Sequence, residues 1–556
     1  MHLFNQLVYR LGLFAVLSVG LFSSAIAAQS LTSQAITVSG ARYLQSMANT
    51  LEGNQAYSRF IEQVASRRRQ LYQIDTDGVL RAFDATTHQE TYTFTPTALS
   101  AASADAAELS AAQDDYPAVS PVVADIYNGT DWRTILVGTL GARAQGLFAL
   151  DITDPDAIQL LWELDSNSDA LKDVAVKLGY SFAQPTIARL HHGRWAVVVG
   201  NGYQAEGGES GVAALYLLDA IDGSLIKSLE VQSDLAQANG LSAPRLADYD
   251  ADGIADYAYA GDLHGNLWRF DLLGEGATGP SVEPVSAGSY GAKSGSSLRF
   301  NLSYAGRPLF IATTTEGTVR QPITAAPSLV PHPTGTGYLV VLGTGLYEGI
   351  KSIESSIDAS TLTHSLYGIW DRQTSGQVTT TDTVTPDQLT EQTISSTSLV
   401  LEHTSDQQRQ ARVLSQHAIE WHTNFDTTQA VKQRGWRLDL KTADTPTGEM
   451  LLDTMRTLGS MLLVQTQARD SSGVQQWLYA INPSSGGATG HHAFELQTAE
   501  EGVVSGVEFA ASAPGAGFTL QSSEEGFVVK SDNDQARITA PPESMGRQSW
   551  RMISSH

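Results

Sequence analysis

Four aspartates in the middle of the chain have the spacing of a calcium-binding loop. They occupy positions one, three, five and nine of a loop that starts at the first of them: Asp248, Asp250, Asp252 and Asp256. The turn glycine of such loops falls at position six, Gly253, and a backbone carbonyl ligand falls at position seven, Ile254. Because Ca²⁺ takes about six to eight oxygen ligands, the pattern predicts one calcium ion held by the four carboxylates and the Ile254 carbonyl.

Two alternatives to this calcium loop make different demands on the sequence. A helix-loop-helix calcium site needs a glutamate at position twelve, where this chain has Tyr259. A solvated acidic turn without metal would leave four neighbouring carboxylates to repel one another. The spacing therefore favours a calcium loop, and one that lies outside a helix-loop-helix motif.

The residues after the loop predict the element that positions it. An apolar segment runs from Tyr257 to Gly261, a turn follows at 264–266, and a second apolar segment runs from Leu267 to Leu272. This is the pattern of two strands joined by a glycine-containing turn. We therefore expect the calcium loop at the entrance of a β-hairpin.

This hairpin belongs to a pattern that recurs along the chain. Each copy has the same order of elements: a proline-led strand, a short loop, a strand that runs toward glycine, a turn, and a strand with an acidic or polar end. Four copies begin at Pro121, Pro185, Pro244 and Pro327. Short strands that recur about every 60 residues are typical of the blades of a β-propeller. In the copy that begins at Pro244, the acidic loop replaces the ordinary turns of the other copies, which read IYNG, LHHG and PTG.

Composition limits the classes of partner and of chemistry. Only 17% of the 556 residues are charged, which suits an exported, turn-rich β protein. The chain has 59 acidic and 34 basic residues and a net charge of −25, which argues against nucleic acid or anionic lipid as the main partner. It has no cysteine, so disulfides, thiolate metal sites and cysteine nucleophiles are excluded.

The N-terminal residues predict export. Arg10 precedes an apolar run at 11–22, and Ala25 and Ala27 are small residues where a signal peptidase reads them. An uncleaved membrane anchor is the alternative, but the run is shorter than the ~20 residues that span a bilayer. We expect a signal peptide at 1–28, a lead-in segment at 29–68, a propeller at 69–540 and a tail at 541–556, with no membrane span after cleavage.

Several weaker features have a simpler explanation than metal binding. A second acidic turn repeats the calcium spacing at Asp165, Asn167, Asp169 and Asp173. Ala170 stands where the turn glycine should be, which favours an exposed turn over a second ion. The sequence Asp-Thr-Asp-Gly at 75–78 fits a hairpin turn. The histidine pairs at 191–192 and 491–492 lack an acidic partner at fixed spacing, so we expect surface histidines.

Other recurring residues predict packing and loops. Five tryptophans at blade positions predict contacts between blades: Trp132, Trp162, Trp195, Trp268 and Trp370. Three stretches rich in small polar residues, at 97–115, 274–295 and about 373–412, predict mobile loops.

The recurring phrases resemble those of a known family, the PilY-type type IV pilus biogenesis factors and tip adhesins, in their C-terminal β-propeller. The similarity covers nearly the whole chain from about residue 70, in one order. The matching phrases include LYQIDTDGVLRAFDAT at 71–86, GLFALDITDP at 146–155, LGYSFAQPTIARLHHGRWAVVVGNGY at 178–203, AGDLHGNLWRFDL at 260–272, SLYGIWD at 365–371, GWRLDL at 435–440 and GRQSWR at 546–551.

The resemblance implies a fold, a metal and a role. The implied fold is all-β, a modified propeller of about seven blades similar to quinoprotein folds, with inserted loops. The implied metal is one Ca²⁺ with ligands Asp248, Asp250, Asp252, Ile254 and Asp256, whose occupancy sets the balance between pilus extension and retraction. The implied partners are minor pilins or other pilus tip components, with a host or abiotic surface as a further target, and the implied location is the periplasm or the outer surface, associated with the pilus.

Three features depart from the family pattern. The chain resembles a short form without the N-terminal von Willebrand A-type domain, because no Asp-x-Ser-x-Ser motif precedes the propeller. No Ser-x-Pro phrase precedes Leu71, so we expect the first blade to be incomplete. No Arg-Gly-Asp tripeptide occurs, which leaves integrin binding without support.

Two other functions are compatible with a calcium-containing propeller. Quinoprotein dehydrogenases hold calcium on the propeller axis with residues from different blades, whereas the ligands predicted here belong to one hairpin. The chain also has no nucleophile elbow and no glycine-rich phosphate loop, so we expect no enzyme activity. A calcium-stabilised surface adhesin without a role in pilus assembly is the main alternative.

Overall fold

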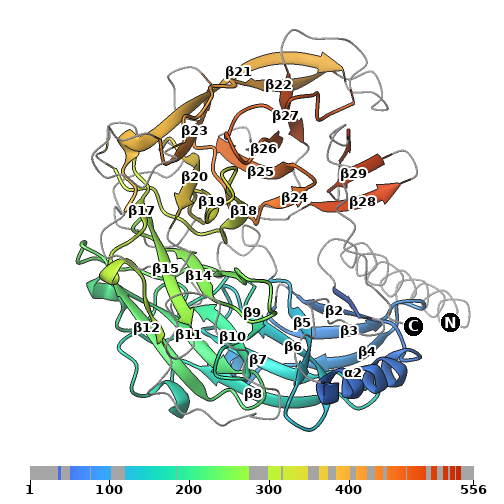
Figure 1. Cartoon of the computed structure of the whole chain (residues 1–556). Helices are drawn as coiled ribbons and strands as arrows, with labels where there is room; N and C mark the ends of the chain where they lie inside the picture. Colours follow the sequence, from blue (N-terminus) through green and yellow to red (C-terminus); the bar gives the residue numbers. More distant parts are fainter. Residues whose placement is uncertain are drawn as a thin grey trace, which may run out of the picture.

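The recurring strands form mainly antiparallel sheets that follow one another in chain order around the molecule, which is the arrangement of a β-propeller (Figure 1). The structure is a computed structural model. It describes residues 36–38, 51–75, 77–101, 119–182, 184–273, 299–314, 317, 319–347, 362–372, 383–400, 408–421, 433–442, 447–470, 473–495, 503–509, 518–523, 526–531 and 534–539. The expected signal peptide at 1–28 and the expected tail at 541–556 lie outside these residues.

Four sheets built mainly from consecutive strands form the first half of the fold. The first contains β1 (Ile36–Val38), β2 (Gln70–Ile74), β3 (Leu80–Asp84) and β4 (Glu90–Phe94). The second contains β5 (Val122–Tyr127), β6 (Trp132–Thr139), β7 (Gly146–Asp151) and β8 (Gln159–Asp165). The third contains β9 (Thr186–Arg189), β10 (Trp195–Gly200), β11 (Val212–Asp219) and β12 (Leu225–Gln232). The fourth contains β13 (Arg245–Ala247), β14 (Tyr257–Gly261), β15 (Asn266–Leu273), β16 (Arg299–Leu302) and β17 (Phe310–Ile311), of which β17 pairs with β15.

The first sheet has four strands, so the expectation of an incomplete first blade was wrong. Its fourth member, β1, comes from the segment expected to be a lead-in, and Ile36 pairs with Tyr72 of β2. The single described α-helix, α2 (Leu51–Val64), also lies in that segment. Its Tyr57 ring lies 4.6 Å from the Trp132 ring of β6. The strand and the helix therefore pack as parts of the propeller.

The second half contains a ten-stranded sheet and a three-stranded sheet. The strands of the larger sheet are β18 (Ser328–Pro331), β19 (Tyr338–Gly343), β20 (Ser365–Asp371), β21 (Leu389–Val400), β22 (Gln408–Leu414), β23 (Gly435–Thr442), β24 (Arg456–Leu458), β25 (Met461–Asp470), β26 (Gly473–Ile481) and β27 (Val504–Phe509). The smaller sheet contains β28 (Thr519–Ser523), β29 (Gly526–Lys530) and β30 (Gln535–Ile538). The described residues thus form six hydrogen-bonded sheets, and the count of about seven blades stays a prediction.

The segment at 373–412 was expected to be a mobile loop, and this expectation was wrong for much of its length. β21 and most of β22 lie within it and pair as a hairpin, with β21 running parallel to β23. The buried positions of β21 include Thr390, Gln392 and Ile394. Because polar residues occupy buried positions here, the segment lacks the apolar alternation that marks the other strands. Threonine still favours the strand conformation.

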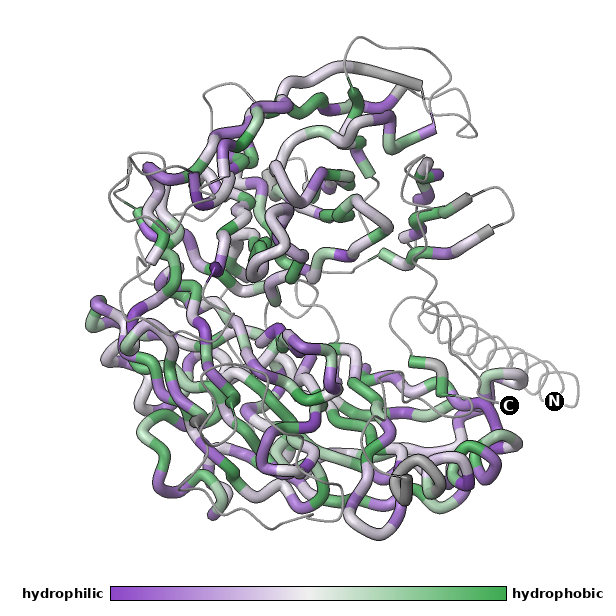
Figure 2. Tube along the Cα trace, in the orientation of Figure 1, coloured by the Kyte–Doolittle hydropathy of each residue, from purple (hydrophilic) through white to green (hydrophobic). Residues whose placement is uncertain are grey.

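Burial follows the position of each strand in its sheet. In the third sheet every residue of β10 is buried, as are all but the first residue of β11. The outer strand β12 alternates between buried and exposed residues over its second half, and the inner strand β9 is half-buried throughout. The middle strands are covered on both faces because each blade packs only against its neighbours. Figure 2 shows the resulting apolar segments within the sheets.

The apolar core is divided into clusters that lie between consecutive sheets. One cluster joins Trp132 of the second sheet to Trp195 of the third, with ring centroids 6.3 Å apart. Trp162 contributes to the same boundary, because its Nε1 donates to the Ala220 carbonyl at 3.1 Å. These contacts confirm the predicted role of these three tryptophans; Trp268 and Trp370 belong to the clusters on the next boundaries.

Short 3₁₀ helices occupy some of the connections: η1 (Thr97–Ala101), η3 (Asp169–Leu171), η4 (Gly208–Ser210), η6 (Tyr304–Gly306) and η8 (Pro386–Gln388). In the part of the chain that the structure describes, no helix combines the length and the apolar character needed to cross a membrane.

Candidate metal centre

The predicted calcium loop connects β13 to β14. The Asp256 backbone N–H donates to the Ala247 carbonyl at 2.8 Å, which closes the loop where the two strands meet. The following hairpin of β14 and β15 is present as predicted, with its turn at 262–265 where 264–266 was expected. The matching connections of other sheets, β5–β6, β9–β10 and β18–β19, are the ordinary turns expected from the repeat. The acidic loop is therefore a local substitution within a common blade plan.

Three of the four aspartates come together at this loop. Asp248, Asp250 and Asp256 each place one carboxylate oxygen within 4.8 Å of the others. Among the described residues, no other group of three or more acidic or histidine side chains meets this distance. Asp256 is buried, Asp248 is half-buried and Asp250 is exposed. The cluster thus extends from the protein interior to its surface, and an ion can enter from the side of Asp250.

Backbone hydrogen bonds hold the loop in a tight turn around the Asp248 carboxylate. This carboxylate accepts from the Asp252 N–H at 3.1 Å and from the Gly253 N–H at 2.8 Å. Gly253 has a φ of 85°, a conformation that glycine adopts without a steric penalty. Ala251 has a φ of 61°, which costs energy in a residue with a Cβ atom. Such local strain is typical of a binding loop.

Asp252, the fourth predicted carboxylate ligand, lies beside the cluster but outside the close group, and its N–H donates to Asp248 and Asp250. Asp252 uses Oδ1 to accept from the Ile254 N–H at 2.8 Å, while its Oδ2 is buried without a hydrogen-bond partner in the described part of the chain. A buried carboxylate oxygen without a donor is unfavourable unless a cation occupies the space next to it. The donor set consists of hard oxygens, which suits calcium.

The environment of the loop disfavours charged carboxylates in the absence of a cation. Burial, together with the neighbouring Asp250 and Asp248 carboxylates, raises the pKa of Asp252 to about 6 against the opposing effect of the Ile254 N–H. Burial also raises the pKa of Asp248 and of Asp256, and Asp250 adds to both shifts. A bound divalent cation would reverse this preference, because it favours the charged form of every neighbouring carboxylate.

His191 is a site residue that sequence reasoning missed. Its Nε2 lies 2.9 Å from Asp256 Oδ1, and the two side chains are 2% and 0% exposed. The expectation of surface histidines at 191–192 was therefore wrong: His192 is buried too, with its ring 6.1 Å from that of Phe300. The pair occupies the β9–β10 turn instead of a strand, and this turn corresponds to the calcium loop of the next blade. This correspondence between the two connections was the signal in the sequence that could have identified His191 as a site residue.

The loop also contacts the blade on its other side. Tyr338 at the start of β19 donates its hydroxyl to the Asp248 carbonyl at 3.2 Å. The rings of Tyr338 and Tyr249 lie 5.7 Å apart in an edge-on arrangement. Residues of three consecutive blades therefore meet at the acidic loop.

The weaker candidate sites have the simpler explanations that the sequence favoured. Asp77 pairs with Arg81 at 2.9 Å, and Asp75 also contacts this guanidinium, so one arginine pairs with both carboxylates of the hairpin turn. Asp165 Oδ1 accepts from the Asn167 N–H at 2.9 Å in a local turn, and Asp169 and Asp173 do not form a close cluster with it. The histidines at 491–492 are half-buried.

Comparison with known proteins agrees with this architecture. A family model described as the PilY1 beta-propeller domain matches residues 28–404. The chain belongs to the PilY1 β-propeller family. This result confirms the family expected from the sequence phrases.

The similar proteins are named for the pilus system. The type IV pilus biogenesis factor PilY1 of Pseudomonas aeruginosa (strain UCBPP-PA14) is 40% identical over 541 residues, which cover 93% of this chain and 45% of that protein. A PilY1 homolog of Xylella fastidiosa is 27% identical over 555 residues, which cover 90% of this chain and 34% of that protein. The chain thus spans less than half the length of these PilY1 relatives.

A solved PilY1 structure has the same fold. The crystal structure of the Pseudomonas aeruginosa PilY1 C-terminal domain superposes with a TM-score of 0.74 at 36% sequence identity. The match covers 91% of this chain and 100% of that one. The PilY1 propeller therefore accounts for nearly all of this chain.

Proposed function

We propose that this chain is a calcium-binding β-propeller of the type IV pilus system that acts in pilus biogenesis and in the balance between pilus extension and retraction. The observation that carries the calcium part is the cluster of Asp248, Asp250 and Asp256, with the unpartnered Asp252 Oδ2 beside it. The pilus part is supported by family membership and by the names of the PilY1 relatives.

The position of the loop suggests how the ion acts. A bound calcium ion supplies positive charge where the carboxylates would otherwise repel one another. His191 donates to Asp256 from the preceding blade, and Tyr338 donates to Asp248 from the following one. These two contacts couple the shape of the loop to both blade boundaries. We propose that an ordered loop makes this face of the propeller competent to bind minor pilins or other pilus tip components.

Calorimetry on the purified chain tests the calcium site. Asp250→Ala is the most informative variant, because Asp250 is exposed and its removal leaves the buried contacts intact. We expect binding of one calcium ion per chain in the wild type and at least tenfold weaker binding in the variant. Asp131→Ala is the matched control, since Asp131 is an exposed aspartate at the end of the equivalent β5–β6 connection. Equal binding by Asp250→Ala and the control would refute the ligand assignment.

Surface piliation tests the pilus role separately. In a strain that retracts its pili, Asp250→Ala at normal protein levels should change the amount of surface pili and the rate of twitching motility. If calcium binding is lost while piliation and motility stay normal, the alternative of a calcium-stabilised surface adhesin replaces this proposal, and attachment to host or abiotic surfaces becomes the function to measure.

The remaining expectations belong to the same proposal. We propose that the chain is exported and pilus-associated and has no enzyme activity; relatives are named biogenesis factors. We also propose that the ten-stranded sheet comprises two blades, β18–β19–β20–β23 and β24–β27, linked by the β21–β22 hairpin. With the three-stranded sheet and the first four sheets, this division gives seven blades.

A further inference from the structure

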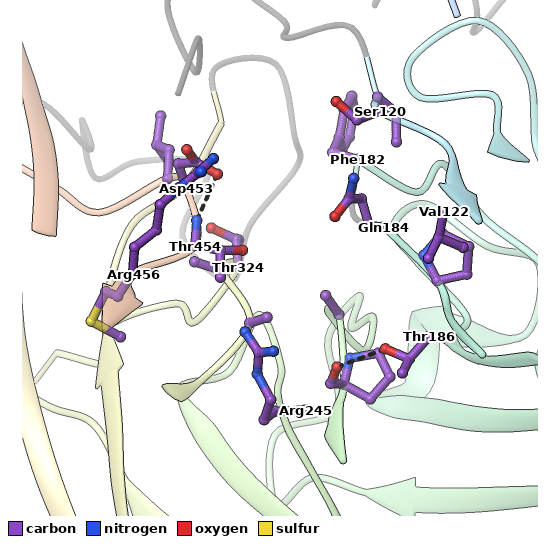
Figure 3. A pocket seen from close by; sticks show the side chains of 18 of the residues that line it. Ser120, Val122, Phe182, Gln184, Thr186, Arg245, Thr324, Asp453, Thr454 and Arg456 are labelled. Atoms are coloured by element: carbon purple, nitrogen blue, oxygen red, sulfur yellow. Dashed lines mark hydrogen bonds between the residues drawn. The ribbon is translucent and has the colours of Figure 1, made fainter. Parts of the chain in front are cut away.

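A cavity of about 670 Å³ lies where the first strands of several blades converge. It is lined by the residues that precede or begin β5, β9, β13 and β24, together with the segment before β18. Figure 3 shows its polar side chains, which include Ser120, Gln184, Thr186, Arg245, Thr324 and Thr454. Cavities of this size hold small organic molecules or short peptide segments.

Arg245 is the distinctive residue of this cavity. Its Nε donates to the Pro327 carbonyl at 2.9 Å, which fixes the side chain between two blades. In the described part of the chain, its two Nη groups have no hydrogen-bond partner, and no carboxylate forms an ion pair with it. Burial lowers the pKa of Arg245, and no acidic neighbour opposes that effect. A half-buried guanidinium whose two Nη groups meet no protein acceptor is well placed to bind an anion, which would supply a counter-charge and hydrogen-bond acceptors together.

The other charged groups of the cavity do not supply that partner. Asp453 accepts from the Thr454 N–H at 2.6 Å, and burial raises the pKa of its carboxyl, which weakens it as a counter-ion. Arg456 adds a second guanidinium and lies over the Phe518 ring at 5.2 Å. The cavity lining therefore carries two arginines and one aspartate in a protein whose net charge is −25. This local reversal of charge concentrates anions at one place on an otherwise acidic molecule.

We infer that the central cavity binds a ligand that carries a carboxylate group, with the Arg245 guanidinium as the group that recognises it. The planar fork of donors on arginine matches the two oxygens of a carboxylate. Thr186 of the third blade and Thr324 of the segment before the fifth blade line the same space, and their hydroxyls donate to the Pro244 and Gly345 carbonyls, which leaves Arg245 as the main free donor. A free organic acid and the C-terminus of a polypeptide share this chemistry. The inference stands independently of the calcium site and of the pilus role.

Calorimetry with two probes tests the inference on the full chain. The first probe is succinate. The second is an acetylated Gly-Ser-Ala-Ala peptide with a free C-terminal carboxylate, compared with the same peptide as its amide. We expect one probe to bind with a one-to-one stoichiometry and to lose at least tenfold in affinity in Arg245→Gln. Arg245→Lys keeps the positive charge but loses the forked donors of the guanidinium, so its affinity should lie between those of the wild type and Arg245→Gln. Arg307→Gln is the matched control, because Arg307 is exposed and lies outside this cavity.

The outcomes separate the two sources and can refute the inference. Binding of succinate alone identifies a free organic acid, and binding of the peptide but not its amide identifies a polypeptide C-terminus. Failure of the wild type to bind either probe at millimolar concentration overturns the inference, as does binding that Arg245→Gln leaves unchanged. Thermal unfolding of each variant establishes that it is folded. If Arg245→Gln does not fold, Arg245→Lys and the wild type with the peptide and its amide still decide the result.

Discussion

His191 Nε2 donates to Asp256 Oδ1 at 2.9 Å, and this buried contact joins the third blade to the acidic loop of the fourth. It is reinforced by the Ala255 N–H, which donates to the Arg189 carbonyl at 3.0 Å. A hydrogen bond from a second residue fixes the orientation of a metal-binding carboxylate. The third blade therefore contributes to the proposed calcium site without supplying a ligand.

Replacing His191 should weaken calcium binding. We expect about tenfold lower affinity in His191→Ala, the lower end of the effect of losing a residue that orients a metal ligand. His191→Gln can still donate to Asp256 and should recover part of the loss. Isothermal titration calorimetry measures both affinities, with His491→Ala as a control on a half-buried histidine far along the chain. An unchanged affinity in His191→Ala would show that the Asp256 carboxylate needs no support from the third blade.

Removal of calcium should lower the thermal stability of the chain. A ligand present at about 100 times its dissociation constant stabilises the folded state by about 2.7 kcal/mol. We therefore expect EGTA to lower the midpoint of thermal unfolding and added calcium to restore it. The Asp250→Ala variant should show a smaller response, whereas Asp131→Ala should respond as the wild type does. Differential scanning calorimetry provides the measurement, and a wild-type midpoint insensitive to EGTA contradicts the prediction.

The boundary between the fourth and fifth blades depends on a buried ion pair. Arg269 on β15 and Asp371 on β20 lie 2.9 Å apart, and both side chains are 0% exposed. Arg269 also pairs with Asp271, and Asp371 also accepts from the Tyr259 and Tyr304 hydroxyls. Removing Asp371 therefore breaks a buried polar network, a change that costs about 3–5 kcal/mol. We expect Asp371→Leu to destabilise the chain by this amount in urea unfolding.

An exposed ion pair provides the comparison for this measurement. Arg68 and Asp156 lie 2.6 Å apart at the surface, and Asp156 is 73% exposed. Surface pairs contribute less than about 1 kcal/mol because water and salt screen them. Asp156→Ala should therefore leave the urea midpoint almost unchanged. Similar losses in Asp156→Ala and Asp371→Leu would show that burial of the Arg269–Asp371 pair has no special energetic role.

Stability should fall on mild acidification because of His332. This histidine is 3% exposed, and its ring stacks on Trp370 with 3.9 Å between centroids. Burial, with an added contribution from the Arg434 charge, lowers its pKa to about 4. The unfolded chain binds a proton at about pH 6.5 while the folded chain does not, so stability is lost between about pH 6.5 and pH 4.

The size of this effect can be measured with a variant that cannot titrate. We expect a loss of about 1–3 kcal/mol from His332 over this pH range, since one unit of pKa shift corresponds to about 1.4 kcal/mol. His332→Phe keeps the stacking on Trp370 and should show a shallower fall in the thermal midpoint than the wild type. Parallel pH profiles for the two proteins would mean that other groups cause the loss.

Local sequence patterns predicted the acidic loop and its hairpin well. Asp248 to Asp256 and the strands that follow are contiguous, so spacing and alternation determine them without knowledge of distant contacts. The recurring proline-led strands similarly predicted the propeller, because each blade is one such unit.

The missed features depend on contacts between distant residues. His191 lies 65 residues from Asp256, and only the ring of blades brings them together. Residues 36–38 complete the first sheet from a segment that the sequence separates from β2 by the α2 helix. Thr390 and Gln392 occupy buried strand positions with polar side chains, so hydropathy concealed β21. Arg245 gave no signal because a single arginine in a strand is ordinary until its surroundings are known.

The parallel pairing of β21 with β23 has a mechanical consequence. Isolated backbone hydrogen bonds and side-chain contacts join the other blades, such as the Ala255 N–H to the Arg189 carbonyl, but here backbone hydrogen bonds run without interruption from β18 to β24. A tensile load that separates the two proposed blades of this sheet must break many peptide hydrogen bonds at once, whereas elsewhere it meets side-chain contacts and a few backbone hydrogen bonds. A pulling force on the chain should therefore separate the blades at another boundary before it separates these two.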